Sequence, residues 1–333
     1  EMPLSEGAVA GVCVGAALSG LRPLYVLQRA DFVFLILDQI INHASKYHFM
    51  FGGEAKVPLT IRLIVGKGWG QGPQHSQSVH SILAHFPGLR VATPADPYSA
   101  KGLLLNSIFS DDPVVIIEGR PLYSASQEIP EEPYVVPFGK AHVLRHGDDI
   151  TIIANSFLVS EALKAAETLA QEGIKAEVID MVSINPLDTE TIASSAAKTG
   201  RALIADTSWS FCGISAEISA VLGERLFGKL KAPITRLTLP STPAPTAAAL
   251  EQRFYPTSEK IVAMSRGLIK SVDITAVAPP EMVTNVGTSE PVPSVTLVFR
   301  SLLRDGARTE AANWLVSVDG MGNISDVMKD AQL

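Results

Sequence analysis

Hydrophobic positions in the first part of the chain alternate between two spacings. Residues 7–19 place small apolar side chains at helical spacing and are followed by Gly20, a natural helix stop. Residues 23–27 form a short apolar run that predicts a buried strand, and the apolar positions of residues 32–44 predict a long helix. Further strands are expected at residues 58–65, 89–92 and 114–118, and further helices at residues 76–85 and from Asp96 or Ser99 to residue 107.

The same alternation returns in the second half of the chain. Residues 124–148 place prolines among acidic side chains and lack periodicity, which indicates a linker. Strands are then expected at residues 149–154, 176–179, 202–205 and 234–237, with one helix that ends before Gly173 and another capped by Asp188. Strands that alternate with helices predict mostly parallel sheets with helices on both faces.

We therefore predict an α/β protein with two doubly wound domains, residues 1–123 and 149–270. Residues 271–333 form a tail in which we find no motif. Within this tail only a strand at residues 295–299 and a turn at residues 320–322 are expected.

Composition narrows the classes of function. Hydrophobic residues make up 47% and charged residues 18% of the chain, which indicates a well-buried globular protein. The formal net charge of -7 and the absence of Lys/Arg runs argue against nucleic acid or an anionic membrane as a partner. The apolar stretch of residues 8–21 is too short to span a membrane and is neither an anchor nor a signal peptide. Two distant cysteines fit a reducing compartment.

Three histidines recur at every fifth position, namely His75, His80 and His85. On a helix, successive imidazoles at this spacing diverge by about 140°, so they cannot share one metal ion. His80 and His85 are therefore interpreted as packing or surface residues. His75 directly follows a glycine-rich loop at residues 66–73, where its imidazole could serve as an acid or a base. The loop lacks the Lys-Ser/Thr pair of a phosphate-binding loop.

Glu6 lies just ahead of the first predicted helix and leaves two interpretations open. A carboxylate at this place is favoured by the helix dipole and can be a simple helix-start residue. A buried carboxyl would instead have a raised pKa and could exchange a proton with a heteroaromatic nitrogen. The position alone does not choose between the two.

A series of short motifs is distributed along most of the chain. They include Pro3-Leu-Ser-Glu6, Gly20-Leu-Arg-Pro23, Asp31-Phe32, Asp38-Gln39-Ile40, Gln74-His-Ser-Gln77, Pro87-Gly-Leu89, Glu177-Val-Ile-Asp180, Asn185-Pro-Leu-Asp188, Lys198-Thr-Gly-Arg201 and Ala216-Glu217. This set resembles the transketolase-type β subunits of pyruvate and branched-chain 2-oxoacid dehydrogenases. The two predicted domains then correspond to a pyrimidine-binding domain and a transketolase C-terminal domain.

The resemblance implies roles for individual residues. Glu6 matches the glutamate that hydrogen-bonds N1′ of the aminopyrimidine of thiamine diphosphate, Phe32 matches the aromatic residue that stacks on this ring, and Leu4 matches a residue that lines the same pocket. His75 matches the active-site histidine that acts in decarboxylation and in acyl transfer to lipoamide. A potassium-binding loop of some members is matched by Leu59, Ser107, Ile108, Ser110 and Asp112.

The resemblance also implies partners. The family's Gly-Asp-Gly motif with a later Asn, which holds the diphosphate and Mg²⁺, is not found in this sequence, so an α subunit is expected to supply it. The implied reaction is oxidative decarboxylation of a 2-oxoacid with a lipoyl disulfide as acceptor. Further implied partners are a second β chain and the lipoyl acyltransferase core. The implied location is the cytoplasm, or the mitochondrial matrix or a plastid in a eukaryote.

Three departures from the family pattern accompany these expectations. The family carries further residues ahead of the match to Glu6, so the chain is expected to be truncated at its N-terminus. Val26 stands at a position that is often acidic, and the tail after residue 270 exceeds the usual end of a β subunit.

Two alternatives remain. The chain could be a fragment of another transketolase-like enzyme or a non-catalytic assembly subunit of the same fold. The joint presence of Glu6, Phe32 and His75 favours a catalytic subunit. The sequence does not indicate which 2-oxoacid is used.

Overall fold

The computed structural model describes residues 2–68 and 70–270, together with three strands in the tail. It separates into two compact units, Glu1–Ile269 and Lys270–Leu333, each of which is described by itself. The second unit is an antiparallel sheet of β11 (Ser294–Asp305), β12 (Arg308–Asp319) and β13 (Ile324–Lys329). The strand predicted at residues 295–299 falls within β11, and the turn predicted at residues 320–322 lies outside the described residues.

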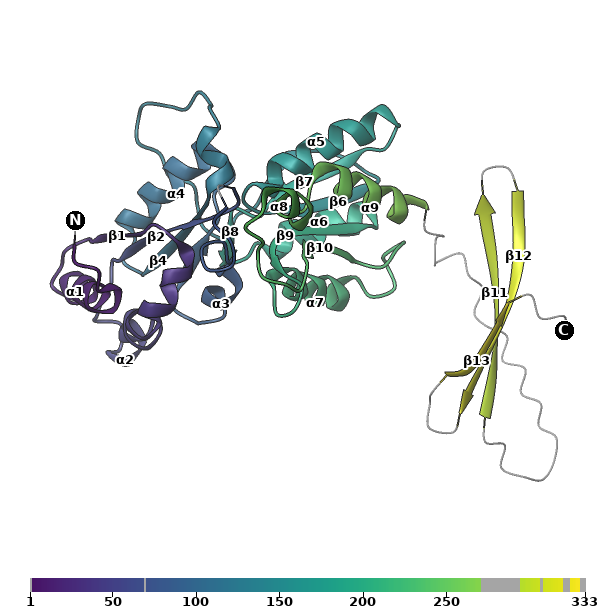
Figure 1. The fold of residues 1–333 in the computed structure, drawn as a ribbon, viewed down its shortest axis with the longest axis horizontal. Helices are drawn as coiled ribbons and strands as arrows, with labels where there is room; N and C mark the ends of the chain where they lie inside the picture. Colours follow the sequence, from purple (N-terminus) through teal and green to yellow (C-terminus); the bar gives the residue numbers. More distant parts are fainter. Residues whose placement is uncertain (1, 69, 271–293, 306–307, 320–323, 330–333) are drawn as a thin grey trace. The chain divides into compact units, whose positions relative to one another are not determined.

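The first half of the larger unit folds around a mainly parallel sheet in the order β1-β2-β4-β3-β8 (Figure 1). Only the pair β3 and β8 is antiparallel. The strands are β1 (Leu24–Leu27), β2 (Thr60–Val65), β3 (Arg90–Ala92), β4 (Val114–Gly119) and β8 (Ser183–Asn185). The helices are α1 (Glu6–Leu18), η1 (Ala30–Ile36), η2 (Asp38–Ala44), α2 (Ser45–Met50), α3 (His80–Ala84), α4 (Pro97–Phe109) and η3 (Arg120–Ser124). Strand β8 comes from the second half of the chain, so the first sheet is completed by a distant segment.

The second half contains a sheet in the order β10-β9-β6-β7-β5, in which only β5 runs antiparallel to its neighbour. Its strands are β5 (His142–Arg145), β6 (Ile150–Ala154), β7 (Ala176–Asp180), β9 (Ala202–Trp209) and β10 (Thr235–Leu239). Its helices are α5 (Leu158–Gln171), α6 (Thr189–Thr199), α7 (Ile214–Leu226), α8 (Ala248–Phe254) and α9 (Ser258–Lys270). The two doubly wound α/β domains predicted from the sequence are confirmed.

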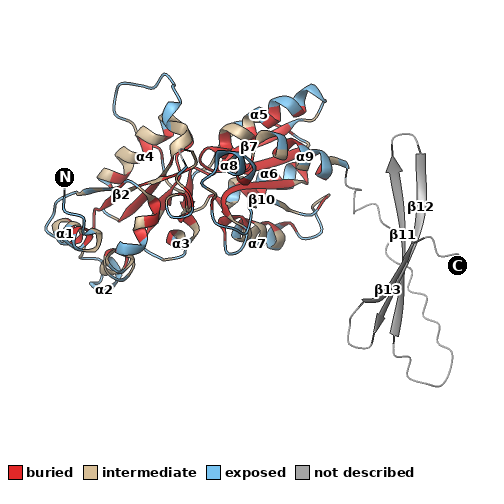
Figure 2. Ribbon diagram, in the orientation of Figure 1, coloured by how far each residue is buried: buried red, intermediate tan, exposed pale blue. Residues whose placement is uncertain are grey.

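The central strands form the cores because most of their residues are apolar, as in the runs ITIIA of β6 and AEVID of β7. Every residue of β6 and β7 is buried, as Figure 2 shows in red. Such runs are expected where helices cover both faces of a parallel sheet. The caps predicted from the sequence are also present: Asp96 and Ser99 form a capping box at α4, and the Asp188 side chain accepts a hydrogen bond from the Thr191 N–H at α6.

Three elements differ from the sequence prediction. The helix expected at residues 32–44 is divided into the 3-10 helix η1 and the π-helix η2, and the helix expected at residues 76–85 is limited to α3. The second change has a visible cause, because Asp31 Oδ1 accepts hydrogen bonds from the backbone and the side chain of Gln77, which lies ahead of α3. The segment 124–148, predicted as a linker, ends in strand β5, whose partner β7 lies beyond it in sequence.

Among the helices of the described residues, none is both long and apolar enough to cross a membrane.

Candidate active site

Phe32 and His75, which are far apart in sequence, meet in the structure. Phe32 lies on η1 and His75 on the loop between β2 and α3, and both are partly buried. Their ring centroids are 5.6 Å apart with an interplanar angle of 82°, an edge-to-face contact. A residue expected to stack on the cofactor and one expected to act in catalysis are therefore in contact.

The glycine-rich loop that precedes His75 is anchored by the second domain. The backbone N–H of Gly68 donates to Glu251 Oε1 at 2.6 Å, so a residue of α8 holds the loop. Gly72 has a φ of +65°, and a Cβ at this position would lie 2.4 Å from Thr246 Oγ1. Only glycine fits this close approach, and the loop is consequently pressed against residues 246–251.

Behind the loop lies a buried polar cluster. Asp31 is buried, and its second oxygen Oδ2 has no hydrogen-bond partner within the described part of the chain. Burial, reinforced by the charges of Glu251 and Asp31, raises the pKa of Tyr255 to about 12. Lys67 Nζ lies 4.7 Å from the ring centre of Phe157 and 5.5 Å from that of Tyr255, and burial lowers the pKa of Lys67. Side chains of both domains therefore pack together next to the glycine-rich loop.

Glu6 is the first residue of α1 and is partly buried. Its backbone oxygen accepts a hydrogen bond from the Tyr25 hydroxyl at 3.4 Å, and its charge helps burial to raise the pKa of Tyr25. Within the described residues its carboxylate makes no hydrogen bond or ion pair. The position suits a helix start and also leaves the carboxylate available to a ligand.

Leu4 extends away from the chain, with 98% of its surface exposed. A pocket wall at Leu4 would therefore need a second molecule to cover it.

The residues of the predicted potassium loop lie around the turn between α4 and β4, and Leu59 joins them from just before β2. The carbonyl oxygen of Leu59 accepts the Val114 N–H at 2.9 Å, and that of Ser107 accepts the Ser110 N–H at 3.2 Å. The carbonyl oxygens of Ile108 and Ser110 both accept from Arg22 Nη1, at 3.1 and 2.7 Å.

The remaining member of that set, Asp112, is bound by Arg90 at 2.6 Å. Carbonyl oxygens suit potassium, and each of these keeps a second lone pair that could face an ion. Because Arg22 already donates to the Ile108 and Ser110 carbonyls, the residues fit the ion only if it lies beside Arg22.

His80 has a function that the sequence did not indicate. It is 1% exposed, and its Nε2 lies 2.9 Å from Oδ1 of the fully buried Asp206 on β9. Burial by itself would raise the pKa of Asp206, but the charge and hydrogen bond of His80 and hydrogen bonds from Ser208 and Ser215 hold that pKa below its usual value. His80 therefore joins the two domains, whereas His85 is exposed and packs on Phe86.

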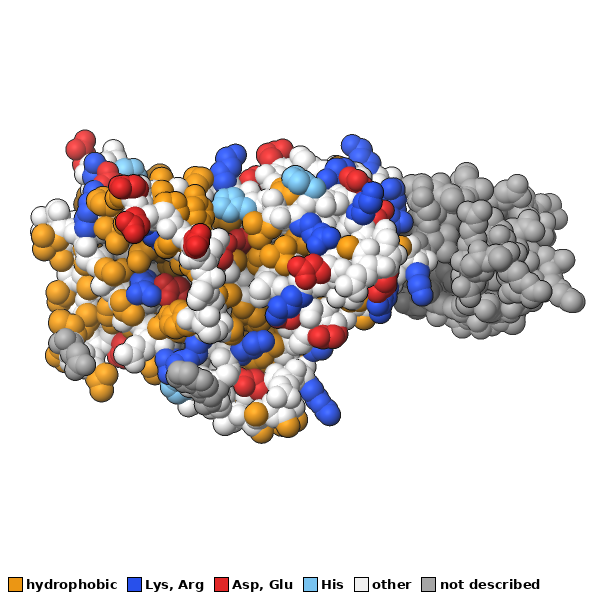
Figure 3. Space-filling model, turned by 90° about the horizontal axis from the view of Figure 1, so that it is seen from above, with side chains coloured by type: hydrophobic (Ala, Val, Ile, Leu, Met, Phe, Trp, Pro, Cys, Tyr) orange, Lys and Arg blue, Asp and Glu red, His pale blue; other side chains and the backbone are white. Residues whose placement is uncertain are grey.

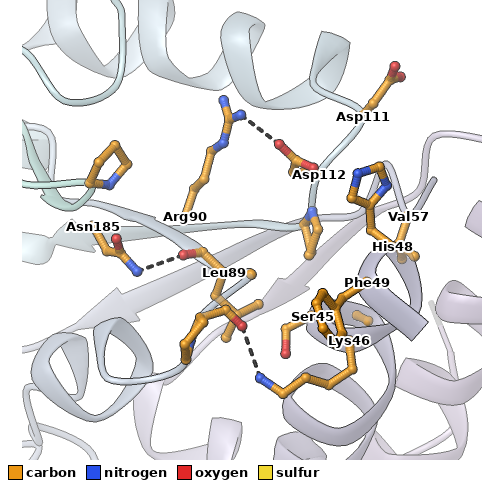
Figure 4. A pocket seen from close by; sticks show the side chains of 15 residues that line it. Ser45, Lys46, His48, Phe49, Val57, Leu89, Arg90, Asp111, Asp112 and Asn185 are labelled. Carbon is orange, nitrogen blue, oxygen red and sulfur yellow. Dashed lines mark hydrogen bonds and ion pairs between the residues drawn. The ribbon is translucent and has the colours of Figure 1, made fainter. Parts of the chain in front are cut away.

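A separate cavity of about 610 Å³ lies on the first domain (Figure 4). Its lining includes Lys46, which donates to the Pro87 carbonyl, the Arg90–Asp112 ion pair, and Asn185, which donates to the Leu89 carbonyl at 2.9 Å. Neither Phe32 nor His75 lines it, so it is distinct from the site described above.

Comparison with known proteins agrees with this architecture. The family model of the transketolase pyrimidine binding domain matches residues 1–126, and that of the transketolase C-terminal domain matches residues 139–261. A solved split-gene transketolase, an inactive β4 tetramer, superimposes with a TM-score of 0.67 at 24% identity and covers 81% of this chain and 83% of its own. This likeness concerns the fold alone. The chain is thus a transketolase-like protein.

Curated relatives narrow the family. The chain is 42% identical over 270 residues to the β subunit of acetoin:2,6-dichlorophenolindophenol oxidoreductase of Cupriavidus necator, covering 81% of this chain and 80% of the relative. It is 40% identical to the 2-oxoisovalerate dehydrogenase β subunit of Bacillus subtilis, over 80% and 83% of the two chains. It is 38% identical to the pyruvate dehydrogenase E1 component β subunit of Staphylococcus epidermidis, over 81% and 83%.

The chain belongs to this family of thiamine-diphosphate-dependent E1 β subunits, as the resemblance predicted. Neither family model extends into residues 271–333.

Proposed function

We propose that this chain is the β half of an E1-type dehydrogenase that decarboxylates a 2-oxoacid and transfers the acyl group to a lipoyl group. The observation that carries the proposal is the contact of Phe32 with His75 beside a glycine loop that both domains hold in place. Bound thiamine diphosphate would supply the electron sink for decarboxylation. The residues of this chain then bind, orient and exchange protons.

Each predicted site residue has a task in this proposal. Phe32 would pack on the aminopyrimidine ring, and Leu4 would become part of the pocket wall once a partner covers it. The unpaired Glu6 carboxylate would hydrogen-bond the ring nitrogen N1′ and move a proton there. His75 would donate or accept a proton at the substrate.

The proposal needs an α subunit. Thiamine diphosphate carries a charged diphosphate and Mg²⁺, for which the sequence shows no site of its own, so the α subunit would hold them. Large exposed apolar side chains lie ahead of α1, on α1, just after it and on η1; among them are Leu4, Val12, Leu21 and Leu35. Figure 3 shows hydrophobic side chains crowded over the first domain. This surface is suited to burial against an α subunit or a second β chain in an α₂β₂ assembly.

Two finer points belong to the same proposal. Potassium would be a structural ion beside Arg22 in the loop between α4 and β4, so replacing K⁺ by choline would lower the thermal midpoint of the complex. The lipoyl acyltransferase core would bind the assembled complex. Bacterial relatives favour the cytoplasm as the location.

The proposal is tested by reconstitution with an α subunit. Dye reduction that depends on a 2-oxoacid, thiamine diphosphate and both chains is the expected result, whereas a stable β monomer that ignores every α subunit would contradict it. In the complex, Glu6→Gln should slow deuterium exchange at C2 of the cofactor by several orders of magnitude, because glutamine keeps the hydrogen bond but cannot cycle a proton. If Glu6 is only a helix-start residue, the variant loses about 0.3–1 kcal/mol of stability and exchanges normally.

A further inference from the structure

Arg29 is a charged residue of this site to which no role has been assigned. It directly precedes η1, is partly buried, and its carbonyl accepts the Phe32 N–H at 3.2 Å. Its Nε donates to Gln71 Oε1 at 2.6 Å, which places the guanidinium against the glycine-rich loop. The next residue of that loop, Gly72, accepts the His75 N–H at 3.4 Å. Arg29 is thus connected to Phe32 through η1 and to His75 through the loop.

The guanidinium of Arg29 is bound by neutral oxygens. Besides Gln71, its described partner is the Gln28 carbonyl, at 2.6 Å. The neighbouring carboxylate of Asp31 is turned to Gln77 instead. Across residues 2–68 and 70–270 no acidic side chain forms an ion pair with Arg29.

Arg62 shows how this fold satisfies a guanidinium of comparable burial. Its Nε and Nη2 bind the two carboxylate oxygens of Glu118, each at 2.7 Å. Removing a cation partly from water without a counter-ion is unfavourable, and a planar guanidinium binds a carboxylate in two parallel hydrogen bonds. Arg29 is therefore a place where an incoming carboxylate would be stabilised.

We propose that Arg29 binds the carboxylate of the substrate and so selects a 2-oxoacid over a neutral ketone. This inference rests on the proposed function and names the substrate class of the same site. The relatives are named for both kinds of compound, since acetoin is neutral whereas pyruvate and 2-oxoisovalerate carry a carboxylate. The charge on Arg29 favours the second kind.

The chemistry fixes which kinetic constant should respond. A carboxylate that departs as CO₂ gives up its charge during the reaction, so a hold on that charge stabilises the bound substrate at least as much as the transition state. Interactions of this kind act on KM more than on kcat. Arg29 is accordingly a specificity residue and not an acid or base.

The test uses the reconstituted complex of α and β chains with pyruvate, 2-oxoisovalerate and acetoin as substrates. Arg29→Gln should raise the KM of the two 2-oxoacids by about 10- to 100-fold, the range for one lost charge-assisted hydrogen-bonding partner, and leave the KM of acetoin unchanged. Arg29→Lys should recover part of the loss. Arg236→Gln is the matched control, because Arg236 is exposed and its Nη1 likewise donates to a neutral oxygen, the Ser210 carbonyl.

The possible failures are distinguishable. A wild-type complex that turns over acetoin and neither 2-oxoacid would overturn the role of Arg29 together with the 2-oxoacid assignment, although the chain would still act as a β subunit. Equal changes for acetoin and pyruvate, or loss of the α contact in Arg29→Gln, would overturn it too. If the complex turns over no substrate, the proposed function fails, and calorimetric titration with pyruvate still decides, because equal pyruvate affinity of wild type and Arg29→Gln, or none in either, overturns the inference.

Discussion

At the scale of single residues, His75 lies on the loop between β2 and α3, where its ring contacts that of Phe32. We expect His75→Ala to reduce turnover of the reconstituted complex by about 10²-fold or more, because an acid–base group is lost, with little change in cofactor affinity. His85→Ala is the control, since His85 is exposed on the same stretch of chain. Loss of thiamine diphosphate binding in His75→Ala would show that the histidine holds the cofactor instead.

Asp180, at the end of β7, links stability to pH. Burial raises its pKa to about 7, the charge of Asp96 adds to this, and a hydrogen bond from the Val182 N–H opposes it. Because the folded-state pKa is raised, the contribution of protonated Asp180 to the free energy of unfolding is fully present below about pH 4. It is lost as the pH rises through about 7.

Asp180→Asn should remove this dependence. Relative to wild type, the variant should gain roughly 2–4 kcal/mol in its free energy of unfolding between pH 4 and pH 8. Denaturant unfolding at several pH values measures the gain. The exposed Asp148→Asn serves as control and should run parallel to wild type, and an Asp180→Asn curve that is also parallel would refute the buried acid.

Residues differ in how far the sequence predicts them. Phe32 and His75 were predicted by resemblance, and the structure brings them into contact. The structural roles of His80 and Arg29 were not predicted, because each depends on a partner elsewhere in the chain, Asp206 and Gln71. A periodic pattern shows which face a residue occupies but not which polar group meets it there.

At the scale of elements, the conformation of the glycine-rich loop depends on its contacts with Thr246 and Glu251. Gly72→Ala combines a strained positive φ with a collision at Thr246 Oγ1, whereas Gly68→Ala at φ +94° meets nothing within 4 Å. We expect Gly68→Ala to cost about 1–2 kcal/mol and Gly72→Ala clearly more.

Adding Thr246→Ala to Gly72→Ala should recover the difference, because it removes Oγ1 and leaves ordinary contacts with the Thr246 Cβ at 3.6 Å and the Gly70 carbonyl oxygen at 3.9 Å. Thermal unfolding of the single and double variants is the measurement. Additive effects of the two substitutions in the double variant would mean that the glycine-rich loop and Thr246 do not touch.

Elements with a strong periodicity were predicted well. The helix at residues 7–19 corresponds to α1 and the strand at 58–65 to β2. The long regular helix at 32–44 was wrong, because the segment is divided into η1 and η2. The start of the helix at 76–85 was also wrong, since the backbone N–H of Gln77 donates to Asp31 instead of joining a helix. Strands β5 and β8 are too short to show an alternation and exist because a neighbouring strand offers an open edge.

At the scale of the whole molecule, the His80–Asp206 pair fastens the two domains together. Removing one member of a buried pair leaves the other unsatisfied, so His80→Leu should destabilise the chain by about 3–5 kcal/mol, and the double variant His80→Leu/Asp206→Leu by less. Because the pKa of Asp206 is lowered in the folded state, its contribution is present above about pH 4 and is lost as the pH falls through the folded-state value. Calorimetry at neutral and acid pH measures both effects.

Either of two results would contradict this account. Equal unfolding temperatures for wild type and His80→Leu would show that the pair does not hold the domains. A double variant less stable than His80→Leu would show that Asp206 acts through Ser208 and Ser215 alone.

The position of strand β8 in the sequence affects how the chain folds during its synthesis. The edge of β3 finds its partner only after β6, α5 and β7 have been synthesised. During translation the first domain therefore leaves the ribosome with the edge of β3 still unpaired, and such edges recruit foreign strands. A stalled nascent chain that exposes residues up to 126 but not β8 should be captured by chaperones that bind exposed strands. One long enough for β8 to have left the ribosome should be released.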